Sequence, residues 1–152
     1  MSNTSDISSP SGKYLIFSLQ GSDYALDLAQ VAEVEDPSLM WPIPLAPDCY
    51  CGALNFHGDI VAVMDLPFFL GLDKCSKPGK IVVLHHEVAS LAFLVDAVIR
   101  IVTGGELSIC PAPDNAFAAA TLHYSGGEAI QLDLESLVLS AEIGMQRNQQ
   151  VL

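Results

Sequence analysis

Cysteine and histidine side chains are the groups in this chain whose chemistry could bind a metal ion or supply a nucleophile. Cys49 and Cys51 closely precede His57, and His85 and His86 follow as a neighbouring pair. This spacing fits no closed zinc template, and a Cys-x-Cys step in a strand directs its two thiols to opposite faces. We therefore expect no metal site and no cofactor. A small cysteine- or metal-dependent hydrolase is kept only as a distant alternative.

Two aspartates, Asp65 and Asp133, lie 68 positions apart, and each precedes a stretch that favours a helix. An aspartate directly before a helix accepts hydrogen bonds from the backbone N–H groups of the first turn. We therefore expect N-caps at these positions rather than a pair of catalytic acids. The sequence also contains no metalloprotease, esterase, phosphate-loop or dinucleotide-binding motif. No catalytic residues are predicted.

The acidic composition excludes several kinds of partner. Among 152 residues, 18 are Asp or Glu and 6 are Lys or Arg, which gives a formal net charge of -12. Nucleic acids and anionic membrane surfaces repel such a chain. The most apolar stretch, 81–101, is interrupted by charged residues and histidines, so no direct membrane insertion is expected. The polar start lacks a signal-peptide pattern, and we expect a cytoplasmic protein with free thiols.

Short apolar stretches separated by turn residues dominate the sequence and predict an all-β fold with short helices. Strands are predicted at 14–19, 24–28, 31–35, 53–56 and 60–64 in the first half, and at 81–85, 91–95, 98–103, 119–124 and 129–132 in the second. Helices are predicted at 66–72 and 134–141. A proline-rich loop follows the third strand, and Trp41 within it is expected to cover the core of the first half.

The two halves of the sequence repeat one another. Val98 follows Val31 by 67 positions, and Leu134 follows Leu66 by 68. The stretch 54–58, which ends in His-Gly, precedes a similar stretch at 122–126 by 68 positions. Several agreeing offsets indicate a duplication, so we expect two β units built on the same plan.

These offsets also predict the organisation of the chain. Units of about 60 residues are only marginally stable alone, so two of them should share a continuous apolar interface. We expect subdomain 1 at about 13–73 and subdomain 2 at about 80–142, joined in a single domain over 13–142. A flexible N-terminal segment, 1–12, and a C-terminal tail, 143–152, are expected to flank this domain.

The segment 52–66 reads Gly-Ala-Leu-Asn-Phe-His-Gly-Asp-Ile-Val-Ala-Val-Met-Asp-Leu and resembles the signature of the CheW family. Matches at 24–26, 44–47 and 94–98 extend the resemblance over about 13–140. The resemblance implies two SH3-like, five-stranded β-barrel subdomains that share a hydrophobic core. It also implies a non-catalytic adaptor that couples the cytoplasmic tips of chemoreceptors to the regulatory domain of a CheA-type histidine kinase. A cytoplasmic chain of this kind would be recruited to receptor arrays at the membrane.

The resemblance points to partner-binding residues on the first lobe. Gly52, Asn55 and Gly58 match the signature, with ordinary turn chemistry as the alternative for the two glycines. His57 stands where the family usually carries an arginine, which faces the glutamate matched by Glu33. As a residue type, histidine is shorter and titrates at about pH 6.5. We hypothesise that His57 approaches Glu33 and gains charge at lower pH, so that coupling becomes pH-sensitive or weaker; drift at an exposed turn is the alternative.

Three apolar residues are further partner-binding candidates. Val31 and Val98 are related by the repeat and are candidates for a groove between the lobes that accepts a receptor helix. Ala92 and Val98, on the second lobe, are weaker candidates than the residues of the first lobe. An amphipathic helix commonly binds in such a groove, although core packing is the alternative for a valine on a strand. The replacement at His57 also leaves open an adaptor of the same fold that serves a different chemosensory or two-component pathway, such as pilus motility.

Overall fold

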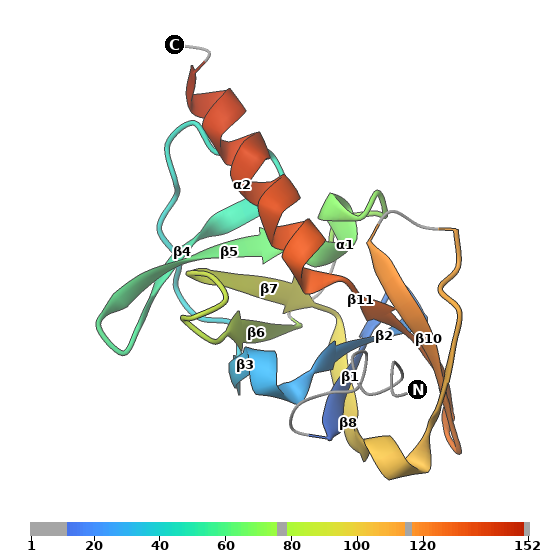
Figure 1. The fold of residues 1–152 in the computed structure, drawn as a ribbon. Helices are drawn as coiled ribbons and strands as arrows, with labels where there is room; N and C mark the ends of the chain where they lie inside the picture. The colour runs from blue at the N-terminus through green and yellow to red at the C-terminus, as the bar shows by residue number, and fades with distance from the viewer. Residues whose placement is uncertain (1–11, 76–78, 115–116, 151–152) are drawn as a thin grey trace.

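The computed structural model describes residues 12–75, 79–114 and 117–150 (Figure 1). Most of their regular structure is β, as the short apolar stretches predict. The strands are β1 (Lys13–Leu19), β2 (Ser22–Asp27), β3 (Val31–Glu35), β4 (Tyr50–Phe56), β5 (Asp59–Asp65), β6 (Lys80–Leu84), β7 (Leu91–Val95), β8 (Ala97–Thr103), β9 (Ser108–Cys110), β10 (Ala118–Tyr124) and β11 (Gly127–Leu132). The α-helices are α1 (Leu66–Phe69) and α2 (Leu134–Gln150). Apart from residue 12, the N-terminal segment predicted to be flexible lies outside the described residues.

The strands form two mixed sheets. The first sheet has six strands in the order β8-β1-β2-β11-β10-β9, and the second has five in the order β3-β6-β7-β5-β4. Neighbouring strands are antiparallel except for β2–β11 and β5–β7, which are parallel. The predicted all-β fold with two lobes is confirmed. The short strand β9 makes the first sheet six-stranded, where five strands were expected.

The repeat is visible in the order of the strands. Strands β8, β1, β2, β11 and β10 of the first sheet correspond, at offsets of 67 or 68 positions, to β3, β6, β7, β5 and β4 of the second. The two five-strand arrangements are therefore equivalent strand by strand. This equivalence confirms the duplication predicted from the sequence.

Each sheet contains strands from both halves of the chain. The β1–β2 hairpin pairs with β8 and β11, and the β6–β7 hairpin pairs with β3 and β5. The predicted boundaries, 13–73 and 80–142, are therefore wrong, because neither range contains a complete sheet. The alternation of apolar residues predicts that a segment is a strand, but it does not say which edge that strand will join.

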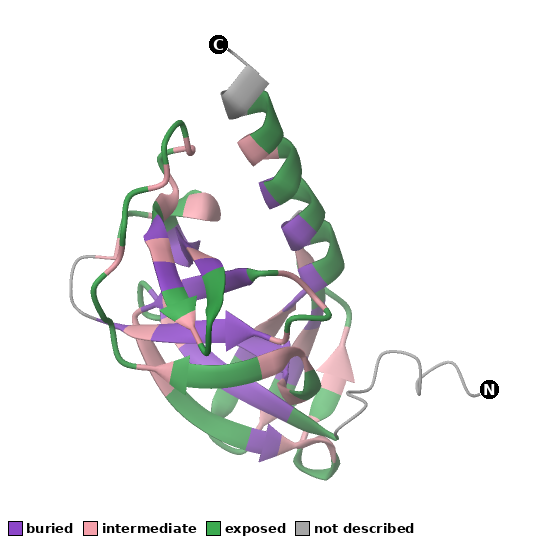
Figure 2. Ribbon diagram, turned by 90° about the vertical axis from the view of Figure 1, so that its left-hand side faces the viewer, coloured by how far each residue is buried: buried purple, intermediate pink, exposed green. Residues whose placement is uncertain are grey.

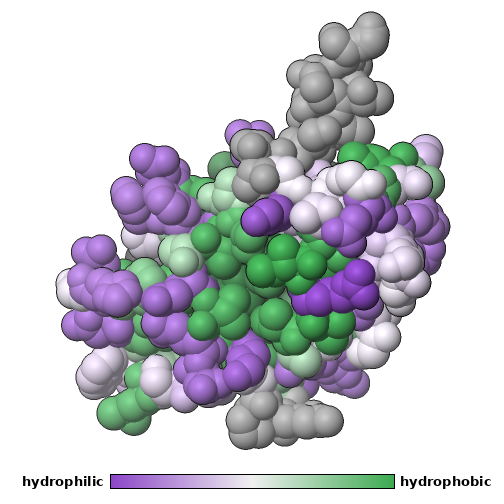
Figure 3. All heavy atoms as spheres, turned by 90° about the horizontal axis from the view of Figure 1, so that it is seen from below, coloured by the Kyte–Doolittle hydropathy of each residue, from purple (hydrophilic) through white to green (hydrophobic). Residues whose placement is uncertain are grey.

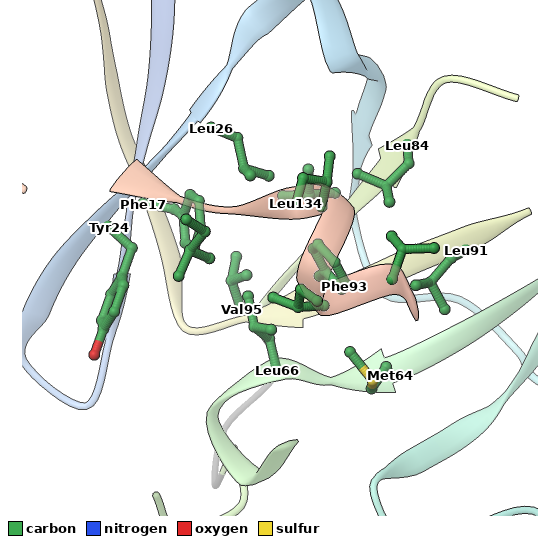
Figure 4. Packing of buried hydrophobic residues seen from close by; sticks show 14 of the residues in the cluster. Phe17, Tyr24, Leu26, Met64, Leu66, Leu84, Leu91, Phe93, Val95 and Leu134 are labelled. Atoms are coloured by element: carbon green, nitrogen blue, oxygen red, sulfur yellow. The ribbon is translucent and has the colours of Figure 1, made fainter. Parts of the chain in front are cut away.

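The central strands of the sheets are buried on both faces. In β1, Leu15 and Phe17 contribute to a core shared by the two sheets, whereas Tyr14 and Ile16 pack in a smaller core formed by strands of the first sheet. Phe93 of β7 enters the same shared core from the other sheet (Figure 4). Full burial of each large apolar side chain contributes about 1.5 to 3 kcal/mol. Figure 2 shows buried residues on strands in the interior of the molecule and on part of the long helix α2.

Helix α2 is longer than predicted. We expected it to end at Ala141 and a tail to follow over 143–152, but the helix continues to Gln150, and only 151–152 lie outside the described residues. The segment beyond Ala141 contains no proline and a single glycine, Gly144, which costs a helix only about 1 kcal/mol. The remaining residues are mostly good helix formers, so nothing local ends the helix at the predicted position.

Both helices begin at the predicted capping residues. The Phe68 N–H donates to the Asp65 carboxylate at 3.1 Å, and the Ser136 N–H donates to the Asp133 carboxylate at 3.3 Å. The two aspartates therefore act as N-caps, as their position before each helix indicates. In the described part of the chain, no helix is long and apolar enough to cross a membrane.

Candidate partner-binding site

The tip of the β4–β5 hairpin brings together several of the residues predicted to bind a partner. His57 and Gly58 form its two-residue turn, with φ angles of 51° and 92°. Positive φ at both turn residues matches the twist of the paired strands, and glycine adopts it without strain. The Gly58 N–H donates to Oδ1 of Asn55 at 2.9 Å. Asn55 and Gly58 therefore shape the turn that carries the His57 ring.

His57 reaches from this tip to the edge strand β3. Its Nε2 atom lies 3.3 Å from Oε1 of Glu33, which confirms the predicted approach of the two side chains. The ring also packs edge-on against Phe56, with 4.4 Å between the ring centroids. The His57 side chain is 73% exposed and that of Glu33 is 47% exposed. A partner that binds at this tip can therefore contact both members of the pair.

A second carboxylate increases the negative charge at this corner. Partial burial of Glu35 and the charge of Glu33, which also forms a hydrogen bond with it, raise the pKa of Glu35. The charge of His57 opposes this rise in the pKa. The corner therefore combines two interacting glutamates with one histidine, and a cation supplied by a partner would be attracted to it.

Gly52 has a structural role rather than a place on the surface. It is buried, and its φ is 148°. A Cβ atom added here would lie 2.7 Å from the backbone oxygen of Trp41, which pairs with Ala53 through two backbone hydrogen bonds. The backbone that approaches Gly52 thus belongs to this chain and not to a partner. Trp41 itself is 55% exposed, so the prediction that it covers the core is wrong.

The apolar residues predicted to bind a partner have different environments. Ala92 is fully buried in the small core formed by strands of the second sheet, so its prediction as a partner-binding residue is wrong. Val31 and Val98 are half-buried and pack against the shared core. Core packing therefore accounts for much of the burial of both valines. Their strands, β3 and β8, lie at equivalent outer edges of the two sheets.

These edge strands expose apolar residues that the sequence analysis missed. Val34 on β3 is 38% exposed, and Ile99 and Ile101 on β8 are 48% and 52% exposed. Figure 3 shows apolar residues gathered across the face seen from below, the side on which β3 and β8 lie in Figure 1. We use the name apolar edge face for the exposed side chains of Val34, Ile99 and Ile101, which lie on the equivalent edge strands of the two sheets. The run Val-Ile-Arg-Ile-Val in β8 carries a signal for it, because apolar residues lie on both faces of this edge strand.

The thiols near the start of β4 are poorly suited to nucleophilic chemistry. Although Cys51 as a residue is exposed, partial shielding of its thiol and the charge of Asp65 raise its pKa to about 11. Burial also raises the pKa of the Cys49 thiol. A thiol with a raised pKa stays protonated near neutral pH, whereas the thiolate is the nucleophile. Over the described ranges, no group of His, Cys, Asp and Glu side chains is arranged to hold a metal ion.

The fold and these surfaces define a class of protein: a duplicated two-sheet β protein with an exposed apolar edge and a polar hairpin tip, both suited to binding other proteins. Residues 13–142 match the family described as the CheW-like domain. The chain belongs to this family.

Individual relatives agree with this assignment. The chemotaxis protein CheW of Klebsiella aerogenes is 28% identical over 144 residues, which cover 90% of this chain and 87% of that protein. The chemotaxis protein CheW of Rhizobium meliloti is 27% identical over 151 residues, which cover 93% and 97%. The crystal structure of the scaffolding protein TtCheW from Thermoanaerobacter tengcongensis superimposes with a TM-score of 0.72 at 27% identity, covering 83% of this chain and 91% of that one.

Proposed function

We propose that this chain is a non-catalytic adaptor that couples the cytoplasmic tips of chemoreceptors to the regulatory domain of a CheA-type histidine kinase. The observation that carries the proposal is the juxtaposition, in a CheW-like chain, of an exposed hairpin tip and an apolar edge face. Two distinct surfaces allow two partners to bind at once. Such an adaptor acts by position, because it lets the conformation of one partner bias the other.

The apolar edge face is the surface we assign to the receptor. A receptor tip is helical, and an amphipathic helix buries its apolar side against an apolar surface of this kind. Val31 and Val98 lie on the same two edge strands, and both pack against the shared core. Ile99 and Ile101 are its most exposed members. Replacing one of them with a charged residue should therefore weaken receptor binding without removing core packing.

The receptor assignment is tested with a matched pair of variants. Ile101 and Leu139 are similarly exposed, at 52% and 57%, but Leu139 lies on α2 and not on the apolar edge face. We expect Ile101→Glu to weaken binding of a receptor-tip fragment by roughly tenfold, because it places a charge in an apolar contact. Leu139→Glu should leave binding unchanged. Equal effects of the two variants would reject this surface as the receptor site.

The hairpin tip is the surface we assign to the kinase. Calorimetry with the regulatory domain of a CheA-type kinase from the same cell tests this assignment, with His57→Arg measured in parallel. Both proteins are compared at about pH 6 and about pH 8, on either side of the range in which histidine titrates. We expect both forms to bind, with affinities that differ at the higher pH, because the replacement changes the charge at the hairpin tip. Absence of kinase binding, or a pull-down that returns no chemoreceptor, would favour an adaptor of another pathway.

A further inference from the structure

A small pocket opens beside the hairpin tip. It has a volume of about 170 Å³ and lies between the β4–β5 hairpin, strand β3 and the loop that joins β6 to β7. Its floor is apolar and includes Val61 and Val83, both almost fully buried. A pocket of this size accommodates one side chain rather than a helix or a large cofactor.

Aromatic rings flank this pocket on two sides. Phe56 and His57 pack edge to face, with 4.4 Å between the ring centroids. On the loop after β6, His85 and His86 stack with 4.5 Å between centroids and 28° between ring planes. A planar group that enters the pocket can therefore contact ring faces or edges from two different segments of the chain.

The charge around the pocket is negative. Asp59 lines it, Glu33 lies against His57, and Glu87 has a carboxylate oxygen 4.0 Å from Nδ1 of His85. No lysine or arginine is found among the described residues that line it. The formal net charge of -12 adds a general attraction for cations.

The aromatic walls, apolar floor and negative rim of this pocket fit one side chain better than any other. The guanidinium of arginine is planar, always charged and weakly hydrated, and it stacks on aromatic faces. Lysine carries the charge as a compact, strongly hydrated ammonium, and phenylalanine carries no charge. We infer that this pocket receives a single arginine side chain of the protein that binds at the hairpin tip. The inference rests on the proposed function, because it names the chemistry by which that partner engages the same corner.

The pocket can be tested without any partner protein. The probe is N-acetyl-arginine amide, titrated to millimolar concentration at about pH 8, where histidine is neutral. We expect saturating NMR shifts at His85, His86 and Ala89, which line the pocket, and no comparable shifts with the citrulline analogue, which keeps the shape and lacks the charge. Equal shifts with the lysine or citrulline analogue, or none with arginine, would overturn the inference.

A variant pair then separates the pocket from the coupling function. His86→Ala removes one exposed ring of the stacked pair, and His123→Ala removes a half-exposed histidine at the equivalent hairpin in the other sheet. We expect His86→Ala to weaken binding of the kinase regulatory domain by roughly three- to tenfold, the range for the loss of one ring contact, and His123→Ala to have no effect. If the kinase domain binds tightly and His86→Ala does not change its affinity, and if no arginine-specific shift is seen, the pocket is rejected and the proposed function is retained. Arginine-specific shifts without kinase binding would retain the pocket and reject the proposed function.

Discussion

At the tip of β4–β5, the His57 ring lies beside Glu33 on the edge strand β3, whereas at the tip of β10–β11 the Tyr124 ring lies against Arg100 on the edge strand β8. Glu33 and Arg100 are 67 positions apart, so they are equivalent in the two repeats. Both contacts therefore join a hairpin tip to the same position of an edge strand. The two repeats therefore have the contact at the same place, but the edge-strand residue is acidic in one and basic in the other. Backbone pairing determines the geometry of each corner, while the side chain at this position determines the sign of the charge that the corner attracts.

The second corner is also held more firmly by its own chain. The Arg100 guanidinium lies 5.2 Å from the centroid of the Tyr124 ring, and the Tyr124 hydroxyl donates to Asp23 at 3.2 Å. Tyr124 is thus contacted from two other strands, while the His57 side chain remains 73% exposed beside Glu33. The Tyr124 ring therefore has more contacts with distant parts of its own chain than the His57 ring has.

The largest effect is expected at Gly52 of β4, a position where only one of the two repeats has glycine. Gly52→Ala places a Cβ against the backbone oxygen of Trp41 at a φ that favours glycine, so we expect a loss of about 1 to 3 kcal/mol in the free energy of unfolding. The equivalent residue in the other repeat is Ala120, and Ala120→Gly should cost only about 0.5 to 1 kcal/mol. Urea denaturation measures both. A smaller loss for Gly52→Ala than for its control would contradict the close approach.

The next effect tests whether the second corner contributes to stability. Arg100→Ala removes the contact with the Tyr124 ring, which is worth about 0.5 to 1 kcal/mol at an exposed site. We expect a loss of that size in urea denaturation, and a much smaller loss when Tyr124 has already been replaced by leucine. An equal loss in both backgrounds would show that Arg100 acts through something other than the ring.

A smaller effect is expected from restoring a permanent charge at the first corner. His57→Arg should pair with Glu33 and raise the free energy of unfolding by about 0.2 to 1 kcal/mol at alkaline pH, since the pair is exposed. The gain should shrink in high salt and vanish in a Glu33→Gln background. A gain that survives both changes would point to turn propensity instead of charge.

The smallest effect concerns Glu35. Its pKa is raised in the folded chain, so the folded state binds the proton more tightly than the unfolded state does. This group therefore lowers stability as pH rises from the ordinary glutamate range, about pH 4.3, through the raised pKa. Glu35→Gln should remove that slope and add less than about 0.5 kcal/mol above this window, because solvent screens an exposed pair. Denaturation midpoints across pH, with Glu128→Gln as control, measure it; an identical slope in the variant would contradict the repulsion from Glu33.

Local features of the fold were predictable because their causes are local. Alternating apolar residues predicted the strands, and an aspartate before each helix predicted the caps at Asp65 and Asp133. The offsets of 67 and 68 positions predicted the duplication that the strand orders confirm. The approach of His57 to Glu33 was also predicted, although by resemblance to the family and not by periodicity.

The features that were missed depend on contacts between distant segments. The β1–β2 hairpin pairs with strands from the second half of the chain, and the β6–β7 hairpin pairs with strands from the first half. This pairing leaves no local signal, because β1 and β6 are apolar on both faces whichever sheet they join. Ala92 was misplaced for the same reason, since the strand that buries it comes from the other half of the chain. Ile101 was overlooked because an apolar residue on a strand is usually buried, and only the strand order shows that β8 is an edge.

The pairing of the β1–β2 hairpin with strands from the second half of the chain also affects when each sheet can form during synthesis. The β1–β2 hairpin leaves the ribosome first, but its neighbours β8 and β11 are synthesised much later, the second of them ending at Leu132. At about 5 to 20 residues per second, the hairpin waits roughly 5 to 20 s with both of its apolar faces uncovered. The second sheet can be completed once β7 has emerged, while the first must await β11. The two sheets are therefore completed in a fixed order, the second before the first, and β1–β2 is the hairpin that remains longest without its neighbouring strands.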